Sequence, residues 1–153
     1  PQLLPAYLNL ADLLRGQSKD TDARQLLLKA LAVDPNNGPT LHALGLLETR
    51  SGQAETALKY LQKAATLETE GTHRFVYGIA LHDLGHPDEA IVQLQSLLRS
   101  VPQNEEVLLA LANYSAELGQ RDKALGYAKT LAQIAPGNRA YQQLVQNLSA
   151  GAP

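Results

Sequence analysis

The hydrophobic residues of this chain recur at helical spacing, and short turns separate the helices that they predict. After Pro87, which suits the first turn of a helix, apolar residues follow at intervals of three: Ile91, Leu94 and Leu97. This helix is expected to stop before Pro102, because proline disfavours helical geometry in the residue before it. Residues 72–84 predict another helix, apolar on more than one side and followed by Gly85. Together the two helices form a hairpin.

The hairpin pattern repeats through most of the chain with a period of roughly 34 residues. The predicted repeats span residues 4–37, 38–70, 71–104 and 105–138. A small residue stands eighth in each repeat, and an alanine follows twelve positions later; these residues are Ala11, Gly45, Gly78 and Ala112, then Ala23, Ala57, Ala90 and Ala124. Three repeats close on a proline, at Pro35, Pro102 and Pro136, whereas the second has Thr69.

The fixed small residues have a physical reason. Helix axes that pack together lie about 8–10 Å apart, and a bulky side chain at the crossing forces them apart. Glycine or alanine at the same place in each repeat therefore predicts a close crossing within every hairpin. Helices that are apolar on two sides need cover from both neighbours, as in a stacked array of hairpins.

These residues resemble the tetratricopeptide repeat family. In the third repeat the resemblance rests on Tyr77, Gly78, Gly85, Ala90 and Pro102, and matching residues occur in the other repeats. The family implies an all-α fold, a right-handed superhelical solenoid, here of four hairpins in a single domain over residues 1–153. The first repeat departs from the pattern, since Ser18 stands where the turn glycine is usual.

Residues 139–149 predict one more helix, which is amphipathic. Its apolar residues have the spacing of a single helix face and are Tyr141, Leu144, Val145 and Leu148. The end of a stacked array needs a polar outer face, so we interpret this segment as a capping helix. The alternative is a helix offered to a partner.

Composition and charge exclude several classes of function. The formal net charge of −2 argues against nucleic-acid binding, and no apolar run is long enough to cross a bilayer. The chain has no cysteine, so thiolate metal sites and covalent haem attachment are excluded. His82 and His86 lie four residues apart, but Gly85 and Pro87 break the helix around them, and we predict no metal, no cofactor and no catalytic residue.

The family resemblance implies that the first helix of each hairpin lines a concave, protein-binding surface. The residues that this assigns to the groove are Leu8, Asn9, Asp12, His42, Leu46, Thr49, Arg50, Phe75, Val76, Ile79, His82, Asp83, Leu109 and Asn113. The same pattern also offers Ala43, Ala110 and Glu117 beside them. The middle of the set is apolar and its edge is polar, which suits a helix or an extended peptide with apolar anchors. Relatives that grip a terminal carboxylate use basic residues here, and this chain has instead Leu8, Asp12, Ala43, Thr72 and Val76.

Two functions follow as hypotheses. The first is a non-catalytic scaffold that binds a protein or peptide, or another domain of the same chain, in the groove. The second is an accessory domain of a larger electron-transfer protein, because residues 6–13 and 76–82 are similar to tetratricopeptide segments fused to bacterial multihaem cytochromes. The second hypothesis implies the periplasm and the first the cytoplasm. The start at Pro1, without methionine, leads us to expect a piece of a longer protein.

Overall fold

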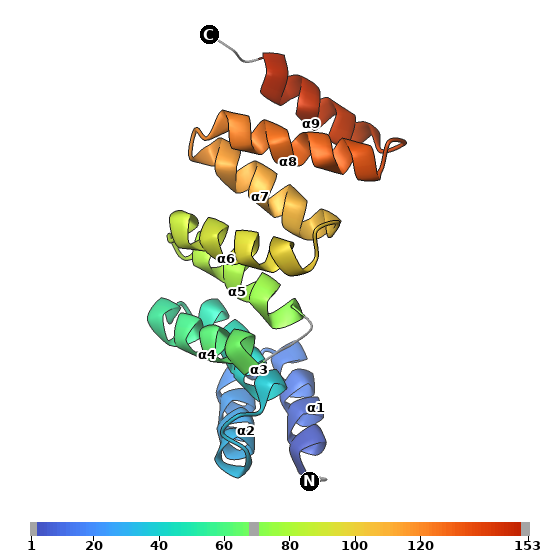
Figure 1. The fold of residues 1–153 in the computed structure, drawn as a ribbon. Helices are drawn as coiled ribbons and strands as arrows, with labels where there is room; N and C mark the ends of the chain where they lie inside the picture. The colour runs from blue at the N-terminus through green and yellow to red at the C-terminus, as the bar shows by residue number, and fades with distance from the viewer. Residues whose placement is uncertain (1–2, 68–70, 151–153) are drawn as a thin grey trace. The chain divides into compact units, whose positions relative to one another are not determined.

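The computed structural model describes residues 3–67 and 71–150, and this part of the chain is helical with short turns and no strand (Figure 1). Its nine helices are α1 (Leu3–Gly16), α2 (Asp20–Val33), α3 (Gly38–Arg50), α4 (Ala54–Leu67), α5 (Thr72–Asp83), α6 (Pro87–Ser100), α7 (Glu105–Glu117), α8 (Arg121–Ile134) and α9 (Arg139–Ala150). The predicted all-α fold of helical hairpins with one further helix is confirmed. Thr69 lies outside the described residues.

The chain divides into two compact units, one up to Tyr77 and the other from Gly78. In the first unit α1 pairs with α2, α3 pairs with α4, and α2 also packs on α3. Its core includes the alanines of the predicted pattern with leucines from both hairpins, namely Ala11, Ala23, Leu27, Leu44 and Leu47. In the second unit α6 packs on α7, α7 pairs with α8, and α8 packs on α9. That the whole chain is one domain of four repeats stays a prediction.

The fixed small residues lie where the helices of a hairpin cross. A Cβ atom built on Gly45 of α3 would lie 2.5 Å from Cγ of Leu61 in α4. A Cβ atom on Gly78 of α5 would lie 2.8 Å from Cδ2 of Leu94 in α6. Non-bonded carbon atoms do not approach so closely, so both helix pairs depend on the missing side chain. The close crossing predicted from the period is confirmed at both glycines.

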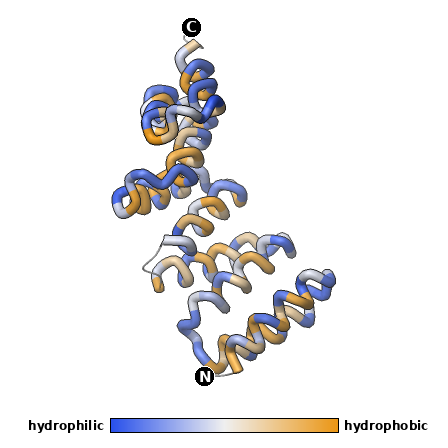
Figure 2. Tube along the Cα trace, turned by 90° about the vertical axis from the view of Figure 1, so that its right-hand side faces the viewer, coloured by the Kyte–Doolittle hydropathy of each residue, from blue (hydrophilic) through white to orange (hydrophobic). Residues whose placement is uncertain are grey.

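The four predicted alanines of the second helices are buried in their units. Ala23 is 1% exposed, and Ala57, Ala90 and Ala124 are fully buried. The hydropathy pattern is visible in Figure 2, where hydrophobic and hydrophilic residues alternate along the helices. Helices α4 and α6 bury one apolar strip, whereas α3 and α7 bury residues on more than one side.

The turn inside each hairpin uses left-handed backbone geometry at one repeated position. Gly52, Gly85 and Gly119 have φ angles of 73°, 90° and 70°, and Ser18 stands at the same place in the first hairpin with φ 59°. Glycine adopts this geometry without a steric penalty, whereas a residue with a Cβ atom does not. Ser18 was identified from sequence as the departure from the glycine pattern, and its backbone explains why glycine is usual there.

Asparagines cap the starts of three helices, α3, α7 and α9. The side chain of Asn37 accepts a hydrogen bond from the backbone N of Thr40 at 3.0 Å, and Asn104 accepts one from Val107 at 2.9 Å. Each side chain satisfies a backbone donor that the first turn of a helix leaves without a partner. Asn138 does the same for α9 through the backbone N of Ala140 at 3.0 Å.

Helix α9 confirms the amphipathic helix expected near the C-terminal end. Its four apolar residues are half-buried, whereas Gln142, Gln143, Gln146 and Asn147 are exposed. Arg121, at the start of α8, donates from Nε to the carbonyl oxygen of Leu148 at 2.6 Å. The apolar side of α9 is thus partly covered and its other side is polar, as an end cap requires.

Ion pairs join the two hairpins of the first unit. The carboxylate of Glu48 in α3 is 1% exposed, and the Nε atom of Arg24 in α2 lies 2.8 Å from its Oε1. A buried carboxylate is costly without such a partner. Arg50, at the end of α3, pairs with Asp20 and also donates to the carbonyl oxygen of Arg15 at 3.4 Å.

We predict that Ser18→Gly stabilises the chain by about 0.5–1 kcal/mol, because glycine removes the cost of the left-handed backbone, less the entropy that it adds to the unfolded state. Urea denaturation measures the change. The reverse substitution, Gly52→Ser at the equivalent position of the second hairpin, is expected to destabilise the chain. Equal stability of all three chains would contradict this account.

We predict that Gly78→Leu destabilises the chain by about 1–3 kcal/mol, because the new side chain overpacks the contact with Leu94. The matched control is Gly126→Leu in α8, where a Cβ atom would meet nothing within 4 Å. The control is expected to be neutral or stabilising, since leucine favours helix more than glycine does. Chemical denaturation of both variants is the measurement, and similar losses in the two would contradict the assigned crossing.

Candidate functional site

The residues predicted to form the groove lie on the first helices of the hairpins, α1, α3, α5 and α7, and the two units are described in turn. The first unit holds Leu8, Asn9, Asp12, His42, Leu46, Thr49, Arg50, Phe75 and Val76. The second holds Ile79, His82, Asp83, Leu109 and Asn113. None of these fourteen side chains is fully buried, whereas neighbouring leucines such as Leu44 and Leu111 are 0% exposed.

The apolar members of the set are partly open to solvent. In the first unit Leu8, Leu46, Phe75 and Val76 are half-buried, and in the second Ile79 and Leu109 are half-buried. Beside them, the rings of His42 and His73 lie with their centroids 4.8 Å apart and tilted by 39°. His73 was not predicted, because nothing in the sequence pairs the start of α5 with the start of α3.

Several polar members already have partners within the fold. Arg50 binds Asp20 and the carbonyl oxygen of Arg15, so its guanidinium fixes α3 to the hairpin before it. Thr49 donates to the carbonyl oxygen of Gly45 at 3.0 Å. Asp12 pairs with Arg15 at 3.1 Å on the surface of α1. These contacts give Arg50 and Thr49 a structural role that the sequence did not indicate.

His82 of α5 lies at the centre of a polar cluster in the second unit. Its Nε2 atom is 2.6 Å from Oε2 of Glu117 in α7, and its Nδ1 atom is 3.3 Å from Oδ1 of Asp83. Its ring stacks on that of Tyr114, with centroids 3.6 Å apart and planes within 2°. A protonated His82 can donate to both carboxylates at once. The cluster thereby ties the end of α5 to the end of α7.

The surroundings of His82 shift two pKa values. Burial is the largest single influence on His82 and lowers its pKa, but the hydrogen bonds to Glu117 and Asp83 and their negative charges together outweigh it and raise the pKa above the usual 6.5. Burial, with the charges of Asp83 and Glu117, raises the pKa of Tyr114 to about 12. Burial thus lowers the pKa of His82 and raises that of Tyr114, whereas the charges of Asp83 and Glu117 raise both.

Tyr114 is not among the residues assigned from the family pattern, whereas the pattern does offer Glu117 at the edge of the groove. They lie one helical turn apart on α7, which places both on the side facing His82. That spacing is present in the sequence, but nothing in the sequence alone pairs it with a histidine 35 residues earlier.

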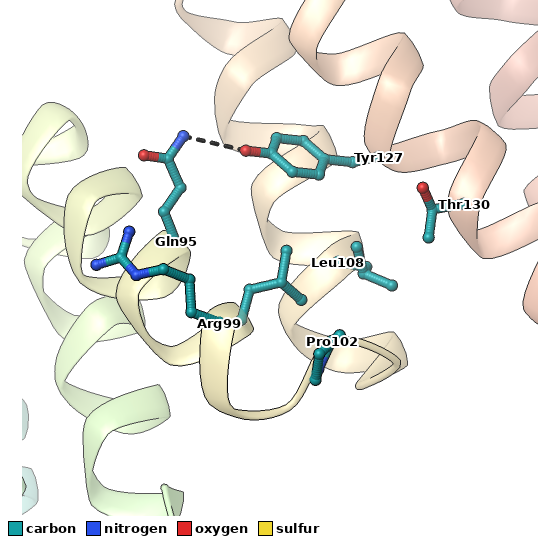
Figure 3. Close-up of a pocket in the computed structure, with 7 residues that line it drawn as sticks. Gln95, Arg99, Pro102, Leu108, Tyr127 and Thr130 are labelled. Atoms are coloured by element: carbon teal, nitrogen blue, oxygen red, sulfur yellow. Dashed lines mark hydrogen bonds between the residues drawn. The ribbon is translucent and has the colours of Figure 1, made fainter.

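A hollow is lined mainly by residues of the second helices α6 and α8, and its lining includes none of the residues predicted for the groove. It has a volume of about 410 Å³ and is lined by Gln95, Leu98, Arg99, Pro102, Leu108, Tyr127 and Thr130. Figure 3 shows Gln95 of α6 and Tyr127 of α8 meeting across it, and Gln95 donates to the Tyr127 hydroxyl at 3.0 Å. One repeat further on, Lys129, Ala132, Gln133 and Gln142 line a second hollow of about 390 Å³. The two hollows therefore lie at equivalent places in successive repeats.

Two further findings concern metal binding and membranes. Among the described residues no group of three or more His, Asp and Glu side chains is placed to hold a metal ion. His86, the second histidine of the pair weighed as ligands, lies 3.1 Å from Glu89 through Nδ1. No helix within residues 3–67 or 71–150 has the length and apolar character to cross a bilayer.

Three family models match the chain, and all three describe the tetratricopeptide repeat. They cover residues 4–33, 26–59 and 81–148, which together make up most of the sequence. With the stacked hairpins and the repeated small residues, these matches show that the chain belongs to the tetratricopeptide repeat family. Proteins of this family act as interaction scaffolds.

Solved structures of similar fold span almost the whole chain. MamA matches with a TM-score of 0.82 and 24% identity, over 98% of this chain and 82% of that chain. YrrB, described as a tetratricopeptide repeat protein with an unusual peptide-binding site, matches with a TM-score of 0.74 and 22% identity, over 94% and 75%. PilF of Pseudomonas aeruginosa matches with a TM-score of 0.79 and 18% identity, over 97% of this chain and 68% of that chain. At these identities the likeness shows the fold.

One curated protein is similar over a shorter stretch. The Protein CTR9 homolog of Arabidopsis thaliana is 48% identical over 48 residues. The match covers 31% of this chain and 4% of that protein, so this chain spans a small part of its length.

We predict that stability falls as the pH rises from about 6.5 through the raised pKa of His82. Protonated His82 is favoured in the folded chain, so its contribution is complete below its unfolded pKa and is lost above its folded pKa. Chemical denaturation between about pH 5.5 and 8.5, from about one unit below the reference pKa to about two units above it, measures this loss. His82→Gln is the control and is expected to flatten the profile. An identical profile in both chains would contradict the assignment.

Proposed function

We propose that this chain is a non-catalytic scaffold that binds a protein or peptide segment on the first helices of its hairpins. Each unit offers its own part of the predicted groove, on α1, α3 and the start of α5 in the first unit, and on the end of α5 and α7 in the second. The mechanism is presentation of a surface, and the proposal assigns no residue to a reaction.

The observation that carries the proposal is a set of apolar side chains that the fold leaves partly uncovered. Leu46, Phe75 and Val76 in the first unit and Ile79 and Leu109 in the second are half-buried beside leucines that are fully buried. Covering such residues with a ligand removes apolar surface from water, which favours binding by roughly 25 cal/mol per Å² before the entropic costs of association. Because the helices are already packed in the free chain, they lose little further conformational freedom when a ligand binds.

Charge suggests which ligands suit the second unit. The side chains of Asp83 and Glu117 are 61% and 57% exposed, and both lie beside His82. A lysine or arginine next to an apolar anchor would meet these carboxylates, whereas an acidic segment would be repelled. We propose a ligand with two or three apolar residues and an adjacent basic residue. The lack of a basic cluster at Leu8, Asp12, Ala43, Thr72 and Val76 argues against a terminal carboxylate as the main anchor.

The unusual peptide-binding site of YrrB supports this class of function for the fold, although that site belongs to YrrB. Whether the natural ligand is a separate protein or another domain of the same chain is left to experiment. The accessory role in a bacterial multihaem cytochrome stays a hypothesis, since no observation of the described residues favours it.

We predict that Phe75→Ser with Ile79→Ser lowers ligand affinity at least about tenfold while leaving the helical content unchanged, because both side chains are only half-buried. The probe is a peptide selected on the wild-type chain from a random displayed library, and titration calorimetry gives its affinity. Val92→Ser, in an exposed apolar residue of α6, is the matched control and is expected to bind normally. Unchanged affinity in the double variant would place the ligand elsewhere.

A further inference from the structure

The hollow on the second helices α6 and α8 carries a cation that the fold itself does not use. The lining of this α6–α8 hollow includes Gln95, Leu98, Arg99, Leu108 and Tyr127. Arg99 is exposed and forms no hydrogen bond or ion pair with any other residue that the structure describes. None of the described residues that line the hollow is an aspartate or a glutamate. The guanidinium can therefore pair with a negative charge that a ligand brings.

The polar groups of the hollow present a second donor. Nε2 of Gln95 donates to the Tyr127 hydroxyl at 3.0 Å, and Figure 3 shows the carbonyl oxygen of Gln95 turned away from that hydroxyl. Because Tyr127 accepts this bond, its own proton is left for another partner. The Thr130 hydroxyl already donates to the carbonyl oxygen of Gly126 at 3.1 Å. The hollow thus offers Tyr127 and Arg99 as donors to the oxygen atoms of a ligand.

The remainder of the lining is largely apolar and opens to solvent. Leu108 is 2% exposed and belongs to the core, Leu98 is half-buried, and Pro102 is exposed. The volume of about 410 Å³ is within the range of ligand sites. With Arg99 and Pro102 both exposed, the hollow does not enclose an occupant. It therefore suits a side chain of a longer segment better than a free small molecule, most of whose surface must be buried.

The repeat does not account for the cation. Arg99 stands at the same place in its repeat as Ala32, Thr66 and Gln133 in the other three. Small or neutral residues are thus sufficient for the fold at this place. The charge of Arg99 is a local addition beside an apolar hollow.

Both second helices of the hollow have their neighbours in the described part of the chain. Helix α6 packs on α5 where Leu94 meets Gly78, and α8 packs on α7 and on α9. The opening of the hollow therefore does not depend on segments that precede or follow the described residues.

We propose that the α6–α8 hollow binds an extended segment of a partner protein in which an aspartate or glutamate stands beside an apolar residue. The apolar side chain packs on Leu98 and Leu108, and the carboxylate pairs with Arg99. The Tyr127 hydroxyl donates to a carbonyl oxygen of the bound backbone. This site is distinct from the proposed groove, whose ligand carries a basic residue.

Amide NMR spectra of the full chain, titrated with short blocked peptides, test the proposal. The peptides are Ala-Φ-Glu-Φ-Ala, in which Φ is leucine, valine or phenylalanine, and a matched set has glutamine in place of glutamate. At about pH 7 the glutamate is ionised. The glutamate peptides are expected to shift the amides of residues 95–102 and 127–130 in a saturable way below about 5 mM. They are expected to bind about twofold to fivefold more tightly than the glutamine peptides, as an exposed ion pair allows.

Variants separate the two donors. Arg99→Gln is expected to abolish the preference for glutamate, and because Arg99 is exposed the helical content should not change. The matched control is Lys29→Gln, which removes an exposed cation from α2 in the first unit and is expected to keep the preference. Tyr127→Phe keeps the ring and removes the hydroxyl, so it is expected to weaken both sets of peptides alike.

Several results would overturn the proposal. One is the lack of a saturable shift in residues 95–102 and 127–130 with every peptide. Others are equal affinity of the wild-type chain for the glutamate and glutamine peptides, or a preference for glutamate that survives in Arg99→Gln. Shifts confined to residues 79–83 and 109–117 would place the peptides in the groove and would overturn the proposal as well.

Discussion

The close crossing of two helices within each hairpin is the contact on which this structure depends. In two hairpins a glycine of the first helix receives the leucine sixteen residues later, Gly45 with Leu61 and Gly78 with Leu94. The last hairpin has alanine at both of these places, Ala112 and Ala128, and both are fully buried. The first hairpin has Ala11 and Leu27 at the matching places, and both are buried in the same cluster. Each crossing therefore has at least one small residue, which is the feature common to all four repeats.

Much of the fold could be predicted from the sequence, because the interactions that define it are short in range. The turn at Ser18, the asparagine caps and the ends of the helices before Pro35, Pro102 and Pro136 depend on a few neighbouring residues. The amphipathic helix near the C-terminal end likewise follows from one helical period. Only the close crossing at the small residues involves contacts between two helices, and it could be predicted because these residues recur at the same place in every repeat.

The details of the candidate site could not be predicted in the same way. That His82 stacks on Tyr114 and bonds Glu117 depends on side chains from two different hairpins and on the rotamers that packing allows. The role of Arg50 depends on Asp20, which precedes it by 30 residues. A period identifies equivalent positions but does not say how exposed each one is, so the exposure of Leu10 and Leu13 became visible only in three dimensions.

The short sequence separation between hydrogen-bonded residues has a consequence for how such a chain folds and evolves. Even the bond from the Tyr141 hydroxyl to Glu105 in the second unit spans only 36 residues, about one period. Chains whose contacts are this local fold quickly, since little loop entropy is lost before contacts form. Because each hairpin requires only its neighbours, duplication or deletion of a whole period in the gene leaves every remaining junction intact. The architecture can therefore lengthen or shorten in evolution without redesign of its interior.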